Sequence, residues 1–374
     1  MGRNASQQGG FVNPPVYRGS TLLFSSLKEL HNPPRGYGYG RGGSPAQENL
    51  AELMCELEQG AYCKFTSCGL SAITGTLLSL VQAGDHILVP DSVFYPTRHF
   101  CDLTLLALGV ETTYYDPLSG ENIKEFIRPE TTVIYTESPG SDTFDIQDIP
   151  AIVAQAQKTG IFVVMDNTWA TPLFYQPLTN GVDISIHSAT KYITGHSDAL
   201  LGIITANERA AKKLKRAQSA LGLCPGSEEV FSALKGLRTL EVRMNKHEEN
   251  ALQLATWLET RDEVAEVLYP ALPSSAGHEL WKRDFSGASG LFSIVLKPCL
   301  DEALAAMVDK LNLFGIGWSW GGYESLIVPL NANGARTVTD WRPKGPFLRI
   351  HAGLEDVEDL KRDLREGFAR LNAP

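Results

Sequence analysis

The stretch that decides the fold is Asp183-Ile-Ser-Ile-His-Ser-Ala-Thr-Lys-Tyr-Ile-Thr-Gly-His-Ser-Asp-Ala-Leu-Leu-Gly202. Val182, Ile184 and Ile186 alternate with polar residues there, which predicts a half-buried strand. Small and hydroxylated residues then surround one lysine, Lys191. A lysine at the mouth of a strand, among serine and threonine hydroxyls, can serve as a nucleophile. A single lysine is more often a solvated surface charge. The rest of the chain therefore has to decide whether Lys191 is a nucleophile or a surface charge.

The chain has 374 residues, which favours a large domain joined to a smaller one. Its hydrophobic fraction of 43% and charged fraction of 20% are typical of a globular protein. The formal net charge of −10 argues against nucleic-acid binding, which usually needs a basic face. No apolar run is long enough to span a membrane, and the first residues lack the apolar core of a signal peptide. We therefore expect a cytoplasmic enzyme without a nucleic-acid or membrane partner.

The six cysteines form no CxxC pair. The chain therefore contains neither a zinc-ribbon spacing nor a redox motif, and we predict no metal site. Reduced thiols are what a cytoplasmic protein normally carries.

Residues 1–40 are rich in proline, glycine and asparagine, which predicts an extended arm that lies on another subunit. Residues 36–43 satisfy the GxGxxG pattern, and a helix is expected to follow them. A dinucleotide-binding motif also needs a strand before it, and Pro33-Pro34 stands there instead. We reject that site. Tyr39 and Arg41 could instead point at an anion, since arginine offers a bidentate fork to phosphate; a plain exposed loop is the alternative.

Apolar strands and helical patterns alternate along the first half of the chain. We expect strands at 86–90, 111–115, 132–136 and 161–166, and helices at 97–108, 122–127 and 149–159. This order predicts a mostly parallel sheet with helices on both faces, where ligands bind beyond the carboxyl ends of the strands. Gly69–Ser71 open an apolar helix whose N-terminus can hold a phosphate; a plain buried helix is the alternative.

Asp166 directly follows one of these strands, and Lys191 follows the next. A carboxylate buried at a strand end needs a cationic partner, which can be a metal, an arginine or a protonated ring nitrogen. An aspartate, a lysine and a phosphate-binding helix start together match what pyridoxal 5′-phosphate requires.

From Glu208 onward the pattern is helical, including one long linking helix over 228–260. A strand within 285–299, a helix at 302–311, a strand at 347–351 and a last helix at 356–371 predict a smaller α+β domain. We place the large domain at 41–240 and the C-terminal domain at 241–374. Arg349 lies inside an apolar strand, where its partner is either a substrate carboxylate or an internal acid.

Eight blocks of sequence now point to one family. They are Tyr37-Gly-Tyr-Gly-Arg41, Glu137-Ser-Pro-Gly140, Met165-Asp-Asn-Thr-Trp-Ala170, Ser188-Ala-Thr-Lys-Tyr192, Gly195-His-Ser-Asp198, Gly236-Leu-Arg-Thr-Leu240, Ser319-Trp-Gly-Gly-Tyr-Glu-Ser325 and Arg349-Ile-His-Ala-Gly-Leu-Glu-Asp356. From about Val12 to its end, the chain resembles the cystathionine β-lyase branch of the Cys/Met-metabolism pyridoxal-phosphate enzymes. The resemblance implies the fold type I (aspartate-aminotransferase-like) architecture and pyridoxal 5′-phosphate as cofactor.

The resemblance also implies roles for residues. Lys191 would form the Schiff base with the cofactor and shuttle a proton, and Asp166 would pair with the pyridine nitrogen. The phosphate would be held by the backbone N–H groups of Gly69 and Leu70 and by the hydroxyls of Ser188 and Thr190.

Other implied roles lie at the subunit boundary and at the substrate. Tyr39 and Arg41 would reach the phosphate of the neighbouring subunit, in a dimer with shared active sites that assembles into a tetramer. Arg349 and Ser319 would bind the substrate α-carboxylate. Trp320 is typical of the β-lyases.

One position departs from the family pattern. The residue stacked on the cofactor ring is usually a tyrosine, and here Phe94 stands there. Phenylalanine can stack but cannot exchange a proton. We expect α,β-elimination of L-cystathionine, or a related cysteine S-conjugate, to homocysteine, pyruvate and ammonia. The alternatives are altered chemistry on the same fold (a specialised cysteine-conjugate lyase, a racemase or a carbon–carbon bond-forming enzyme) and a regulatory protein that only retains the cofactor.

Overall fold

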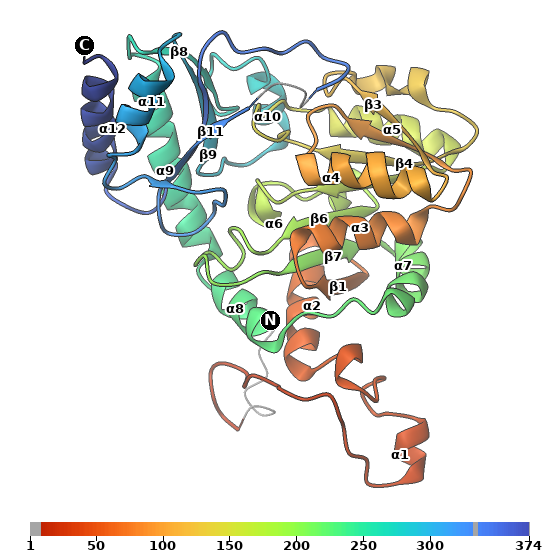
Figure 1. Ribbon diagram of the computed structural model, residues 1–374. Helices are drawn as coiled ribbons and strands as arrows, with labels where there is room; N and C mark the ends of the chain where they lie inside the picture. The colour runs from red at the N-terminus through yellow and green to blue at the C-terminus, as the bar shows by residue number, and fades with distance from the viewer. Residues whose placement is uncertain (1–8, 332–335, 374) are drawn as a thin grey trace.

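A seven-stranded sheet lies at the centre of the molecule (Figure 1). The computed structural model describes residues 9–331 and 336–373. The strand order is β1-β7-β6-β5-β4-β2-β3, and only β7 is antiparallel to its neighbours. This confirms the mostly parallel sheet. The strands are β1 (Tyr62–Thr66), β2 (His86–Pro90), β3 (Glu111–Tyr115), β4 (Thr131–Glu137), β5 (Phe162–Asp166), β6 (Ile184–Ser188) and β7 (Gly202–Ala206).

Helices cover both faces of this sheet, which explains why its inner strands are apolar on both sides. On one face pack α3 (Gly69–Leu80), η3 (Phe100–Leu105) and α7 (Glu208–Leu221). On the other face pack α2 (Pro45–Glu58), α5 (Ile149–Thr159) and α8 (Ser227–Leu237). Shorter helices connect them: α4 (Tyr95–His99), η4 (Gly120–Phe126), α6 (Thr171–Phe174) and η5 (Leu178–Asn180).

A second, five-stranded sheet is built from the last third of the chain, in the order β10-β11-β12-β9-β8. All its pairs are antiparallel except β10 with β11. Its strands are β8 (Val264–Leu268), β9 (Leu291–Leu296), β10 (Gly315–Ile316), β11 (Leu326–Leu330) and β12 (Phe347–His351). The accompanying helices are α9 (Leu240–Leu258), α10 (His278–Asp284), α11 (Asp301–Val308) and α12 (Val357–Leu371). The predicted domain limits at residues 40 and 240 stay a prediction.

The long linking helix predicted over 228–260 is wrong. The structure has two helices, α8 and α9, separated at Arg238 and Thr239. The Arg243 guanidinium donates to the Gly236 carbonyl at 2.8 Å and to the Tyr192 carbonyl at 2.7 Å. The bond to Tyr192 is a tertiary contact, and a Cβ on Gly236 would lie 2.1 Å from the Ile193 carbonyl oxygen, so the end of α8 is fixed by packing against the segment after Lys191.

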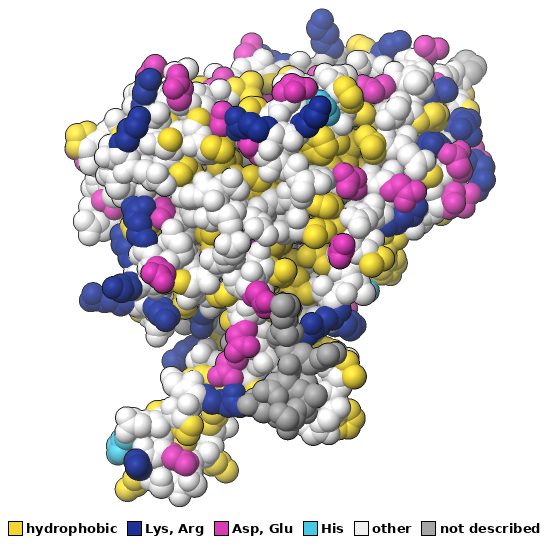
Figure 2. Space-filling view, turned by 180° about the vertical axis from the view of Figure 1, so that it is seen from behind, with side chains coloured by type: hydrophobic (Ala, Val, Ile, Leu, Met, Phe, Trp, Pro, Cys, Tyr) yellow, Lys and Arg dark blue, Asp and Glu magenta, His cyan; other side chains and the backbone are white. Residues whose placement is uncertain are grey.

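Residues 9–43 leave the body as an arm (Figure 1). Within its described part, α1 (Leu27–His31) buries no residue and η2 (Gly40–Gly42) follows a single bridge between Thr21 and Tyr39. Seen from behind, the arm is a lobe below the body with hydrophobic side chains at its edges (Figure 2). Leu23 is 94% exposed and Leu27 is 73% exposed. The described part of the arm therefore has no core of its own.

Candidate active site

Lys191 lies in the turn after β6, where its backbone N–H donates to the Ser188 carbonyl at 3.0 Å. Its Nζ donates to Ser319 Oγ at 2.9 Å and lies 5.2 Å from the centre of the Trp320 ring. Burial, and then the charge of Arg349, lower the pKa of Lys191 to about 8. A lysine whose neutral form is accessible near physiological pH can act as a nucleophile and a base, so Lys191 is not a surface charge.

The Ser319–Trp320 turn can reach Lys191 because a glycine follows it. Gly321 has φ +85°, and a Cβ placed there would lie 2.8 Å from the backbone carbonyl carbon of Lys191. A side chain would be strained by the dihedral angle and would also collide. The structure thus brings three predicted residues, Lys191, Ser319 and Trp320, into contact.

Asp166 ends β5 at the carboxyl edge of the sheet. Its Oδ1 accepts hydrogen bonds from the Thr168 N–H at 3.0 Å and the Thr168 hydroxyl at 2.5 Å. The same hydroxyl accepts from the Ser188 N–H at 2.8 Å, which connects the ends of β5 and β6. Burial raises the pKa of Asp166 despite these bonds. A cation facing this carboxylate would offset its loss of hydration.

Glu137 also lies at this edge, although no role was predicted for it. It ends β4 beside Asp166, with which it is in register. Burial and the Asp166 carboxyl raise the pKa of Glu137 to about 8. Its carboxyl oxygens accept from the Phe94 N–H at 2.9 Å and the Ser141 hydroxyl at 2.6 Å. Its position at the end of a buried strand, like that of Asp166, was the available signal.

The start of α3 forms a cradle next to Ser188. Cys68 caps this helix, with its sulfur accepting from the Ser71 N–H at 3.4 Å. A Cβ on Gly69 would lie 2.6 Å from Ser188 Oγ, so only glycine permits this approach. The N–H groups of Gly69 and Leu70 belong to the first turn, which has no partners within a helix. Free N–H groups, the positive end of the helix and a hydroxyl suit a phosphate.

The Thr190 hydroxyl, which was expected to bind the phosphate, bonds to the backbone of Leu201. Its Oγ1 accepts from the Leu201 N–H at 3.0 Å, within the loop that leads to β7. Its part in holding a phosphate stays a prediction.

Phe94 is the residue before α4 and is 41% exposed. Its bond to Glu137 places its backbone at the edge that carries Asp166. The adjacent Tyr95 is 63% exposed and stacks on His99, with ring centres 6.0 Å apart. Tyr95 therefore does not take the place of the tyrosine that the family usually has at position 94.

Arg349 lies in β12 and is paired with an internal acid. Its Nη1 is 3.2 Å from Asp142 Oδ1, and its Nη2 donates to the Trp318 carbonyl at 2.7 Å. This confirms the internal-acid alternative for the free chain. Arg349 also lies close enough to lower the pKa of Lys191, so it remains next to the reactive amine. Asp142 was not singled out from the sequence, because it lies in a loop without a periodic pattern.

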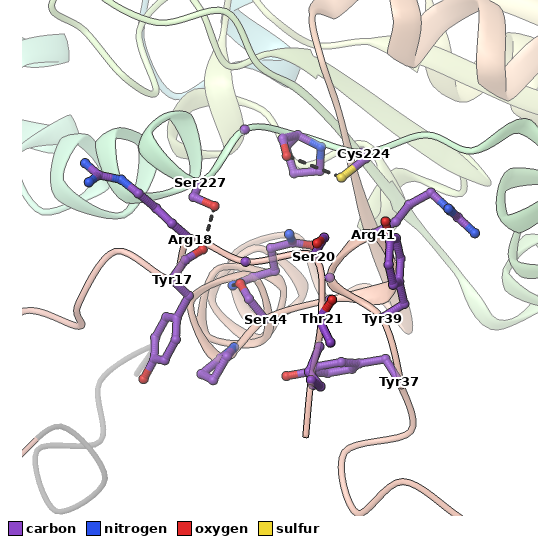
Figure 3. A pocket seen from close by; sticks show the side chains of 18 of the residues that line it. Tyr17, Arg18, Ser20, Thr21, Tyr37, Tyr39, Arg41, Ser44, Cys224 and Ser227 are labelled. Atoms are coloured by element: carbon purple, nitrogen blue, oxygen red, sulfur yellow. Dashed lines mark hydrogen bonds between the residues drawn. The ribbon is translucent and has the colours of Figure 1, made fainter. Parts of the chain in front are cut away.

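Tyr39 and Arg41 line a different cavity. This cavity has a volume of about 870 Å³ and lies between the arm and the segment that precedes α8 (Figure 3). Ser227 Oγ donates to the Tyr17 carbonyl at 2.6 Å across it. Figure 3 shows the Arg41 side chain extending outward from the rim. Lys191 is not among the residues that line this cavity.

The comparisons agree with this geometry. Residues 1–369 match the model of the Cys/Met metabolism PLP-dependent enzyme family, and the chain belongs to that family. Cystathionine beta-lyase MetC of Escherichia coli is 41% identical, over 99% of this chain and 96% of that protein. The L-alanine/L-glutamate racemase of Wolbachia pipientis is 40% identical, over 99% of this chain and 95% of that protein.

A solved structure supports the fold as well. Cystathionine gamma synthase from Xanthomonas oryzae, in complex with cystathionine, has a TM-score of 0.89 and 31% identity, and the match covers 97% of this chain and 94% of that one. The chain thus has the fold type I architecture, and the cofactor of its family is pyridoxal phosphate. The Lys191 amine, the Asp166 carboxylate and the Gly69–Ser188 cradle fit that cofactor.

Among the described residues, all six cysteines are free and no helix is long and apolar enough to cross a membrane.

Proposed function

We propose that this protein is a pyridoxal-phosphate-dependent carbon–sulfur lyase that cleaves L-cystathionine, or a related L-cysteine S-conjugate. The products are a thiol (homocysteine from cystathionine), pyruvate and ammonia, and one water is consumed. The observation that carries this proposal is the buried Lys191 amine, held by Ser319 and placed beside Arg349. Family membership and the relatives named cystathionine beta-lyase support it.

The cofactor, when bound, takes up the electron pair left on Cα as its C–H bond breaks. Lys191 Nζ is the group that removes this proton, because it is buried and has its pKa lowered to about 8. The Ser319 hydroxyl accepts a hydrogen bond from Nζ and so fixes its direction. The Asp166 carboxylate, at the end of β5, would hold the proton on the ring nitrogen of the bound cofactor.

Arg349 and Ser319 orient the substrate by its α-carboxylate. The guanidinium offers two N–H groups side by side, which suits a carboxylate. Trp320 lies against the Lys191 amine and closes this side from water.

The arm provides the second half of the site in an oligomer. Its exposed leucines and the outward Arg41 side chain support a dimer in which Tyr39 and Arg41 reach the phosphate of the neighbouring subunit. We extend this to a tetramer in the cytoplasm, with an arm (1–40), a large domain (41–240) and a C-terminal domain (241–374).

The test is pyruvate release from L-cystathionine, L-cystine and L-cysteine, followed together with the absorbance of the bound cofactor. We expect release from cystathionine and its loss in Lys191→Ala. Lys158→Ala is the matched control. Lys158 is an exposed lysine of α5, and its Nζ donates a hydrogen bond to Gln155. A Lys191→Ala variant that keeps both the absorbance of the lysine-bound cofactor and turnover would exclude the mechanism.

Racemisation is the second candidate function. Phe94 favours it, because this side chain cannot exchange a proton during elimination, and one relative is named L-alanine/L-glutamate racemase. The measurement is exchange of the Cα hydrogen of L-alanine with deuterated water, together with D-alanine formation. Exchange without pyruvate release from any sulfur substrate would select this reaction.

A further inference from the structure

The Arg349–Asp142 pair does more than hold an arginine in place. The side chain of Arg349 is 12% exposed and that of Asp142 is 38% exposed, so the pair lies at the mouth of the site. Asp142 has φ +64°, a left-handed conformation that points the loop after β4 toward β12. The Asp142 carboxylate thus binds the Arg349 guanidinium, which in the proposed function binds the substrate α-carboxylate.

The charges at this edge leave Asp142 short of a cation once a substrate is bound. The inference rests on the proposed function, in which Arg349 moves its charge to the substrate α-carboxylate. Asp142 then remains close to the buried Glu137 carboxyl, which accepts a hydrogen bond from the hydroxyl of Ser141, the residue before Asp142. Burial raises the pKa of Asp142 even with Arg349 beside it. A partly buried carboxylate without a counter-ion is costly, so a new cation is favoured there.

We propose that Asp142 is a specificity-determining residue: it pairs with Arg349 in the free protein and with a second ammonium group of the substrate in the complex. The substrate class that it selects is a diamino dicarboxylic acid. The α-ammonium of such a substrate lies at the Lys191 end of the site, and the second ammonium, on a flexible thioether arm, can fold back to Asp142. A cysteine conjugate without the second ammonium also displaces Asp142 from Arg349, but it supplies no cation to pair with the Asp142 carboxylate.

Diaminosuberate and aminosuberate test this directly. Diaminosuberate is cystathionine with the sulfur replaced by a methylene group, so it binds but cannot be cleaved, and aminosuberate lacks only the second ammonium. Their dissociation constants come from the change in cofactor absorbance of the loaded protein. We expect diaminosuberate to bind about tenfold more tightly, which is the scale of one charge-assisted contact.

Asp142→Asn is the variant that isolates the charge. Asparagine tolerates the left-handed conformation as aspartate does, so the loop keeps its path. The preference for diaminosuberate should fall to about equal binding, and aminosuberate should bind as tightly as before or more tightly. The control is Asp359→Asn, which removes a carboxylate paired with Arg362 on the outer helix α12 and should leave the preference unchanged.

Two outcomes overturn the inference: equal binding of the two ligands to the native protein, or an unchanged preference in Asp142→Asn because both ligands weaken in proportion or not at all. A proportional weakening would mean that Asp142 only orients Arg349. The comparison of the two ligands on the native protein needs no variant, so it tests the inference even if Asp142→Asn misfolds. Pyruvate release from cystathionine is measured separately, so failure of the lyase activity is distinguishable from failure of the ligand preference.

Discussion

Lys191 is surrounded by groups that favour its neutral form. An ordinary lysine has a pKa of 10.5, and here burial and the charge of Arg349 lower it to about 8. The neutral amine is the form that attacks an aldehyde, so the charge state of this single residue controls loading of the cofactor.

The pH dependence of loading follows from this shift. In cofactor-free protein, the rate of pyridoxal-phosphate uptake should rise as the pH increases toward about 8 and level off above it. An unperturbed lysine would give a rate that still rises at pH 9. The measurement is the absorbance change after mixing, over a series of buffers. Arg349→Gln removes a positive charge and should move the midpoint to higher pH, whereas Arg362→Gln on the exposed face of α12 should not; a midpoint equal in all three would contradict the role of Arg349.

Gly321 carries the second prediction at this scale. Gly321→Ala should destabilise the protein by more than about 2 kcal/mol and impair catalysis, because strain at φ +85° adds to the collision with Lys191. Gly84→Ala is the matched control, since Gly84 has φ +91° but open space around it. Urea unfolding of both variants separates strain from collision. Equal losses of stability would show that the Ser319–Trp320 turn does not depend on close approach to Lys191.

Among the elements, we propose that the start of α3 holds the cofactor phosphate. Its glycine lies against Ser188 of β6, and its first N–H groups face the carboxyl edge of the sheet. Gly69→Ala places a methyl group in this cradle without a left-handed strain, because Gly69 has no positive φ. The affinity for pyridoxal phosphate should fall by about tenfold or more, whereas that for pyridoxal, which has no phosphate, should hardly change. Equal losses for both ligands would contradict a phosphate site at α3.

The elements also show what the sequence could and could not predict. Asp166 and Lys191 were predictable because each directly follows an apolar run, and parallel strands end at one edge. The break between α8 and α9 was not, because Arg243 at the start of α9 is bonded to the Tyr192 carbonyl, which is far away in the sequence. Asp142 was missed for a similar reason, since only the fold brings its loop to Arg349 of β12. Long-range contacts of this kind leave no periodic signal in the sequence.

At the scale of the whole molecule, the arm and the catalytic edge are separate within one chain. Tyr39 and Arg41 line the cavity between the arm and the segment before α8, and Lys191 does not. If a second copy supplies Tyr39 and Arg41, each active site combines residues of two chains, and this has a consequence that single variants cannot show.

Two inactive variants should therefore restore each other when they are mixed. Lys191→Ala abolishes the site of its own chain, and Arg41→Gln impairs the site of the neighbour. In a mixed dimer one site carries both substitutions and the other carries neither. After random exchange of subunits half of the dimers are mixed, so the activity should return to about a quarter of the native value. The measurement is pyruvate release before and after brief unfolding and refolding of an equimolar mixture, with each variant refolded alone as the control. If Arg41 acted within its own chain, each site of a mixed dimer would carry one substitution, either Lys191→Ala or Arg41→Gln. No site would then be native, and no activity would return.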